Sequence, residues 1–402
     1  MRPARDMVAE EWKATIEQAE IHVRKGTLPL IGWRAEGPRI LRLSADEAQG
    51  QWYFIGDLHG DHRAWETLFA RVCSDPEFRL CFLGDVVDRG PYHVECLAAL
   101  LQAAMDHPDR ILWLLGNHDA AHRRNEDCSE GAPRYVSRVE PAEFVDWLNA
   151  RTDDQGWSDR ILDLLNTICH RLPRAALFSD GLLATHGGLP LADQWANITA
   201  LEHFEDARVL EDFTWTRAVD APRRRGWQYA PERRKRSSDF EFGWRDLQEF
   251  ATVFSELFPV RRVVRGHDHV AGGWARPDAY QQAVPLLTLN GFGFDHLTNS
   301  MEQYREYLVL GVYKKDQLPR VEEVSVPQPV GAVCGGYEPS RPPAAHMGIQ
   351  AGFATAVPMV AGDWVPHMPL WPMLIAAVAA AVSIIAAALA AATLMMAVVA
   401  AQ

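Results

Sequence analysis

An α/β fold is predicted by two observations: apolar strand-like runs alternate with helical stretches, and several of the runs end in polar turns that contain glycine. The order within residues 51–120 is strand, helix, strand, helix, strand, over residues 52–55, 64–72, 80–83, 94–105 and 111–115. Strands separated by helices in this way pair in a largely parallel sheet. The composition agrees, because 48% of the 402 residues are hydrophobic, enough to bury a large core.

Further helices and strands flank this unit. An amphipathic pattern over residues 9–23 predicts an N-terminal helix. A helical insertion is predicted at 121–180, with helices at 142–149 and 159–170. Short strands are predicted to follow at 182–185, 260–264, 285–289 and 307–313. We therefore expect an N-terminal helical and extended segment, 1–50, and one folded domain, 51–326.

The C-terminal part of the chain has a different composition. Residues 327–372 are rich in proline and glycine and predict a linker. Residues 373–401 are 29 consecutive uncharged residues, which as one helix would be about 43 Å long, more than a bilayer core needs. The alternative is an alanine-rich buried helix, because 14 of the 29 are alanine. We expect a transmembrane helix that anchors the protein by its C-terminus.

Charge and targeting signals limit the partners and the compartment. The 40 basic and 53 acidic side chains give a net charge of −13, which argues against nucleic acid as a partner. Residues 1–13 contain three carboxylates and no apolar core, so no secretory signal is visible. We therefore expect the main domain to lie on the cytoplasmic side of the membrane.

Metal-seeking side chains gather in five turns, each directly after a predicted strand. The turns read G-D-L-H-G, G-D-V-V-D-R-G, G-N-H-D, T-H-G-G and R-G-H-D-H, at residues 56–60, 84–90, 116–119, 185–188 and 265–269. Ligands in open α/β sheets bind at the carboxyl ends of the strands, so these side chains are expected to meet. Carboxylates and an amide mixed with imidazoles suit manganese, iron or zinc better than calcium.

These five segments, in this order, resemble the phosphoprotein (serine/threonine) phosphatase family of the calcineurin-like metallophosphoesterases, and look like a bacterial-type member. The resemblance covers residues 51–313 and implies a β-sandwich flanked by helices. It also implies a hydrolase that holds two divalent metal ions, manganese first, with iron or zinc as alternatives. A hydroxide held between the two ions would attack phosphorus directly, without a phosphoenzyme.

The resemblance also implies a role for each matching residue. The first metal would be bound by Asp57 and His59, Asp85 would bridge, and the second metal would be completed by Asn117, His186 and His267. The catalytic residues would be His118, Asp88 and Arg89: His118 would protonate the leaving oxygen, Asp88 would orient His118, and Arg89 would hold the phosphoryl group. The segment F-E-F-G at 240–243 resembles a family stretch that places Arg236 as a second substrate-binding arginine.

His269 is an open question at this stage. Phosphoprotein phosphatases usually lack a histidine at this position, whereas the wider metallophosphoesterase pattern G-H-x-H uses it on the first metal. A ligand role and a structural role both remain.

Three functions are considered. The first is a phosphomonoesterase acting on phosphoserine or phosphothreonine in proteins, which the V-D-R-G and H-G-G motifs favour. The second is a dinucleoside polyphosphate hydrolase of the same fold, favoured by the aspartate that ends G-N-H-D at position 119. The third is a non-catalytic membrane-tethered scaffold, which the complete set of expected ligands argues against.

Overall fold

The computed structural model describes residues 9–33, 38–127, 129, 131–151, 155–222, 241–294 and 304–327. The chain divides into two compact units, 1–345 and 346–402, and the described residues all belong to the first. Among the described residues, no helix is long and apolar enough to cross a membrane. The predicted transmembrane segment 373–401, nearly all of the predicted linker and Arg236 lie outside the described residues.

A five-stranded sheet contains the strands of the first predicted unit. Its order is β15 (Arg320–Ser325), β14 (Tyr307–Lys314), β2 (Gln51–Ile55), β3 (Arg79–Phe82) and β4 (Ile111–Trp113). The strands β2, β3 and β4 run parallel, as predicted, while β14 is antiparallel to both of its neighbours.

A second, six-stranded sheet is formed by strands from distant parts of the chain. Its order is β1 (Ile40–Leu43), β7 (Ala175–Phe178), β8 (Leu182–Thr185), β11 (Arg262–Arg265), β13 (Leu286–Leu289) and β12 (Trp274–Ala275). The strands β8, β11 and β13 are parallel, so their carboxyl ends share one edge. The largely parallel sheet predicted from the strand–helix alternation is present only as β2, β3 and β4, because both sheets also contain antiparallel pairs.

The two sheets pack face to face through one apolar layer. Trp52 and Phe54 of β2 meet Phe178 of β7, with ring centroids 5.0 and 6.1 Å apart. Cys81 of β3, Leu112 of β4 and residues of β8, β11 and β13 complete this layer. The alternate residues of β2, such as Tyr53 and Ile55, face the helices instead. Because both faces of the strand are buried, its sequence is a continuous apolar run without polar alternation.

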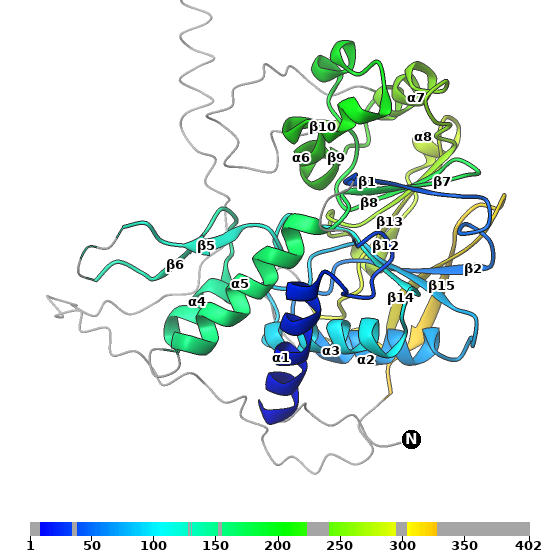
Figure 1. Ribbon diagram of the computed structural model, residues 1–402. Helices are drawn as coiled ribbons and strands as arrows, with labels where there is room; N and C mark the ends of the chain where they lie inside the picture. The colour runs from blue at the N-terminus through cyan, green and yellow to red at the C-terminus, as the bar shows by residue number, and fades with distance from the viewer. Residues whose placement is uncertain are drawn as a thin grey trace, which may run out of the picture. The chain divides into compact units, whose positions relative to one another are not determined.

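Helices cover the outer face of each sheet (Figure 1). The five-stranded sheet is covered by α1 (Ala9–Lys25), α2 (His62–Val72), α3 (His93–Asp106) and α5 (Gln155–Arg171). The six-stranded sheet is covered by α6 (Ala207–Trp215), α7 (Trp244–Val253) and α8 (Asp278–Gln281). This is the α/β sandwich flanked by helices that the resemblance implies.

The segment 121–180 contains more than the predicted helices. It begins with a hairpin of β5 (His122–Arg124) and β6 (Tyr135–Ser137), continues with α4 (Glu143–Ala150) and α5, and ends in β7. Beyond it, a two-stranded ribbon pairs β9 (Arg217–Ala218) with β10 (Glu241–Phe242). The hairpin escaped prediction because each strand has only three residues, and β5 is largely charged.

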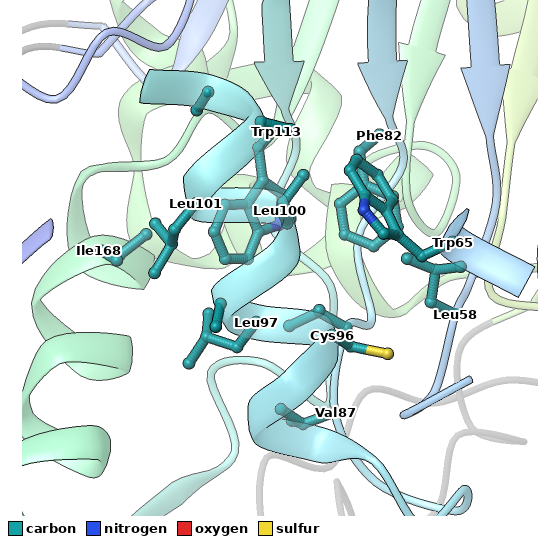
Figure 2. Packing of buried hydrophobic residues seen from close by; sticks show 14 of the residues in the cluster. Leu58, Trp65, Phe82, Val87, Cys96, Leu97, Leu100, Leu101, Trp113 and Ile168 are labelled. Atoms are coloured by element: carbon teal, nitrogen blue, oxygen red, sulfur yellow. The ribbon is translucent and has the colours of Figure 1, made fainter. Parts of the chain in front are cut away.

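Helix α3 packs against the five-stranded sheet through its leucines. Figure 2 shows Leu97, Leu100 and Leu101 of α3 together with Trp113 of β4 and Ile168 of α5. All of these side chains are at most 1% exposed. The leucines therefore join helix, sheet and neighbouring helix in one apolar cluster.

Replacing Leu100 by alanine should lower the free energy of unfolding by about 2–5 kcal/mol, because a fully buried side chain leaves a cavity. Leu318, which is 57% exposed, provides a matched control, and Leu318→Ala should change the value by less than about 0.5 kcal/mol. Urea unfolding of the two variants measures both. Similar losses in the two would contradict the assignment of α3 to the core.

Candidate metal centre

The five predicted turns meet at one edge of the sandwich. The loops after β2 and β3 are tied together by backbone hydrogen bonds, in which the N–H groups of Leu58 and His59 donate to Asp85 O at 3.0 and 2.9 Å. The loop after β13 joins them, since the N–H groups of Gly291 and Phe292 both donate to Asp57 O. The site is therefore built on strand ends fixed by hydrogen bonds between loops.

Backbone strain is concentrated at this edge. Seven non-glycine residues in the described part of the chain have a positive φ, and five of them are expected site residues. These are His59, Asp85, Asp88, Arg89 and His267, with φ between 48° and 71°. Such conformations cost energy and persist where the surrounding structure holds them. The strained backbone is thus a feature of the loops that present the ligands.

Two glycines allow close approach of the backbone to the ligands. A Cβ atom on Gly116 would lie 2.1 Å from Asp85 Oδ1, and one on Gly266 would lie 2.3 Å from Asp57 Oδ1. Any side chain at these positions would displace the carboxylates. The glycines of G-N-H-D and R-G-H-D-H therefore serve the geometry of the site.

Asp57, His59 and His269 form the first group of potential metal ligands. His269 Nε2 lies 3.6 Å and His59 Nε2 lies 3.8 Å from Asp57 Oδ2, and the two nitrogens are 3.1 Å apart. Asp57 Oδ2 is buried and has no hydrogen-bond partner among the described residues. A buried carboxylate oxygen facing two imidazole nitrogens fits a divalent cation.

Asn117, His186 and His267 form the second group together with Asp85. Asn117 Oδ1 lies 3.0 Å from His186 Nε2 and 2.8 Å from His267 Nδ1. His186 Nε2 is 3.3 Å from Asp85 Oδ2. The ligand atoms of Asp85, His186 and His267 all lie within 4.8 Å of one another.

Asp85 lies between the two groups. Its Oδ2 atom is 3.7 Å from His59 Nε2 on one side and 3.3 Å from His186 Nε2 on the other. Its Oδ1 atom accepts a hydrogen bond from the backbone N–H of His118 at 2.8 Å. One carboxylate therefore faces both clusters, which is the arrangement that two neighbouring cations require.

Backbone carbonyls orient the histidine rings. His59 Nδ1 donates to Val87 O at 3.0 Å, and His186 Nδ1 donates to Leu83 O at 2.8 Å. His267 Nε2 donates to Trp215 O at 3.2 Å. Because a carbonyl oxygen only accepts, the nitrogen bound to it carries a proton, and the opposite nitrogen of each ring faces the site.

The electrostatics of the site favour a bound cation. Burial, assisted by the charge of His118, holds the pKa of His59 well below its usual value, and burial together with Arg217 does the same for His267. Both rings are therefore neutral, as metal ligands must be. Against the effect of burial, the carboxylate of Asp85 raises the pKa of His186 to about 9. Without a metal, the carboxylates therefore favour a proton on His186, one of the expected metal ligands.

His118 and Asp88 form a buried pair beside the metal ligands. His118 Nδ1 lies 2.7 Å from Asp88 Oδ2, and Asp88 Oδ1 accepts the backbone N–H of Phe144 at 3.0 Å. Burial lowers the pKa of His118, but Asp85 and Asp88 outweigh it and raise this pKa above its usual value. The geometry allows His118 to donate a proton from Nε2.

Arg89 also lies at the site. Its charge contributes to lowering the pKa values of His59 and His269. Its Nε atom is buried and has no hydrogen-bond partner in the described part of the chain. This unpartnered donor makes Arg89 a candidate for binding an anionic ligand.

Two residues border the site without having been predicted to belong to it. Arg217 follows α6 and its Nη1 lies 2.6 Å from Asp268 Oδ1 and 3.5 Å from His267 O, with the side chain 31% exposed. An isolated arginine outside any recognised motif gave no signal. The carboxylate of Asp119 accepts hydrogen bonds from the N–H groups of Asp85 and Val86 at 3.0 and 2.8 Å, so it holds the bridging loop in place.

Comparisons with known proteins agree with this geometry. The family model of the calcineurin-like phosphoesterases matches residues 52–271, and the chain belongs to this family. Membership of this family implies a hydrolase that uses divalent metal ions, and the chain has serine/threonine phosphatase homologues.

Two curated relatives are serine/threonine-protein phosphatases. One from Caenorhabditis elegans is 28% identical over 232 residues, which is 57% of this chain and 45% of the relative. A PP2A-like phosphatase of Candida albicans, PPG1, is 27% identical over 166 residues, 40% of this chain and 36% of the relative. The chain thus spans less than half the length of these relatives.

A solved structure shares the fold. It is a serine/threonine phosphatase from Saccharomyces cerevisiae with similarity to human PP5, and the match has a TM-score of 0.52 at 18% identity. It covers 80% of this chain and 91% of that one. This likeness supports the two-sheet sandwich fold.

Proposed function

We propose that the protein hydrolyses phosphoserine and phosphothreonine in proteins at a site that holds two divalent cations. The observation that carries the proposal is the position of Asp85 Oδ2 between His59 Nε2 and His186 Nε2. The serine/threonine phosphatases among the relatives favour phosphoprotein substrates over other phosphoesters.

The first cation would be held by Asp57, His59 and Asp85, with His269 as a further ligand. The second would be held by Asp85, Asn117, His186 and His267. Manganese suits this mixture of oxygen and nitrogen donors, and iron and zinc are alternatives. The bound cations would supply an activated water and would neutralise charge on the phosphoryl oxygens.

The chain's own residues would then bind the substrate and deliver a proton. Arg89, whose Nε has no hydrogen-bond partner among the described residues, would donate to a phosphoryl oxygen. His118 would give its proton to the leaving serine or threonine oxygen, and Asp88 would keep the ring in position. A second arginine would complete the clamp, and both Arg217 and Arg236 are candidates for this role.

A dinucleoside polyphosphate hydrolase is the alternative. The aspartate at position 119 favours it, because protein-directed members of the family commonly have glutamate there. Asp119 carries out a structural task in this chain, which weakens that argument.

The full-length protein with added manganese should release phosphate from phosphothreonine and phosphoserine peptides, and removal of metal by a chelator should abolish the activity. Asp85→Asn should lower kcat/KM by at least about 100-fold, because the bridging charge is lost. Diadenosine tetraphosphate is assayed in parallel. Turnover of that compound with no release from the peptides would favour the alternative.

Metal binding and substrate binding should separate in two sets of variants. His269→Ala should weaken binding of the first metal by at least about 10-fold, measured by metal titration. Arg217→Ala and Arg236→Ala should leave the metal content unchanged. If one of these two arginines binds the phosphoryl group, its replacement should raise KM for the phosphopeptide by about 10-fold or more. Unchanged metal binding in His269→Ala would assign that residue a structural role.

We propose further that residues 373–401 anchor the protein in a membrane and that the catalytic domain faces the cytosol. The support is the absence of any charge over 29 residues.

Deletion of residues 373–402 should move the protein from the membrane pellet to the supernatant, because the apolar segment that binds the bilayer is gone. Activity on a small phosphomonoester should stay within about twofold, since the site lies in the first unit. Centrifugation measures the distribution between pellet and supernatant, and a phosphate-release assay measures the activity. A truncated protein that stays in the pellet would rule out this anchor.

A further inference from the structure

His122 is a buried histidine that the proposed mechanism does not use. It begins β5, at the base of the hairpin that opens the 121–180 segment, and is 2% exposed. Neither of its ring nitrogens has the geometry of a hydrogen bond within the described residues, although Nε2 lies within ion-pair distance of a carboxylate. A buried polar ring without hydrogen bonds is costly, so its position calls for a reason.

The ring of His122 faces the catalytic pair. Its Nε2 atom lies 3.2 Å from Asp88 Oδ2, the same oxygen that His118 Nδ1 approaches to 2.7 Å. The charge of His122 is also the main influence that, against burial, holds the pKa of Asp88 well below its usual value. The imidazole rings of His118 and His122 therefore both lie close to Asp88 Oδ2.

Phe144 fixes this group of side chains from the other side. Its backbone N–H donates to Asp88 Oδ1 at 3.0 Å, and its ring packs edge-on against the His122 ring at 5.2 Å. All four partners, His118, His122, Asp88 and Phe144, are at most 6% exposed. In such a site the orientation of one carboxylate depends on every neighbour that touches it.

We propose that His122 is a positioning residue for proton delivery to the leaving group. It holds Asp88 Oδ2 in the orientation that keeps the Nε2–H of His118 directed at the substrate. This inference rests on the proposed phosphatase function. It adds a third member, His122, to the pair formed by Asp88 and His118.

The reaction defines what the arrangement must do. The bond between phosphorus and the leaving oxygen breaks, and that oxygen takes the proton from His118. Water supplies the new oxygen on phosphorus, and a proton lost by the water restores the imidazole. A serine or threonine oxygen leaves poorly as an anion and needs this proton, whereas p-nitrophenolate is a stable anion and leaves without it.

The choice of substrate therefore tests the role of His122. In the full-length manganese-loaded protein, His122→Phe should lower kcat on a phosphothreonine peptide by about 10–100-fold, within the range for general acid catalysis. On p-nitrophenyl phosphate the loss should be less than about threefold. KM and metal content should not change, because neither Arg89 nor a metal ligand is altered.

Two further variants separate positioning from packing. His122→Gln retains an N–H donor near Asp88 and should recover much of the peptide activity. His93→Phe is the control, because His93 is also buried and packs on the same Phe144 ring at 5.7 Å, and its Nδ1 makes no hydrogen bond within the described residues. It should affect both substrates equally, by less than about threefold.

Equal losses on both substrates in His122→Phe, or an unaltered peptide rate, would overturn the inference. A wild-type protein that hydrolyses p-nitrophenyl phosphate but no phosphopeptide would overturn the proposed function, and this inference with it. The two failures differ, because the second appears before any variant is made.

Discussion

The position of the Asp85 carboxylate is the constraint on which the rest of the site depends. Its Oδ2 atom faces one imidazole from each sheet, while its backbone carbonyl accepts two N–H groups from the loop after β2. Its own N–H is held by Asp119, and its φ of 61° is kept by these contacts. Because these hydrogen bonds fix its backbone, Asp85 holds its carboxylate charge at one position, and catalysis by bound cations depends on such fixed charges.

Much of this arrangement could be predicted from sequence for a physical reason. The run at 182–185 and those at 52–55 and 80–83 lie within one residue of the observed strands. Parallel strands bring their carboxyl ends to one edge, so polar turns after separate strands had to meet. The residues expected to bind metal are indeed side by side, although their roles as ligands remain proposals.

Other features depend on contacts that a local pattern does not contain. The strand β1 pairs with β7 across more than a hundred residues, and each has only four residues. The division into two sheets follows from which strands pair, which periodicity does not specify. Arg217 and His122 belong to no motif. Their proximity to the site is visible only in the folded structure, where Arg217 contacts Asp268 and His122 contacts Asp88.

The hydrogen bond from His186 to Leu83 O has a wider consequence, because it joins the end of one sheet to the loop of the other. Apolar contacts between the sheets fix their separation but tolerate small sliding, whereas this polar contact fixes their alignment along the strands. The edge that contains the site therefore also keeps the two sheets aligned with each other. Substitutions in the apolar layer between the sheets should therefore displace the metal ligands before they unfold the protein.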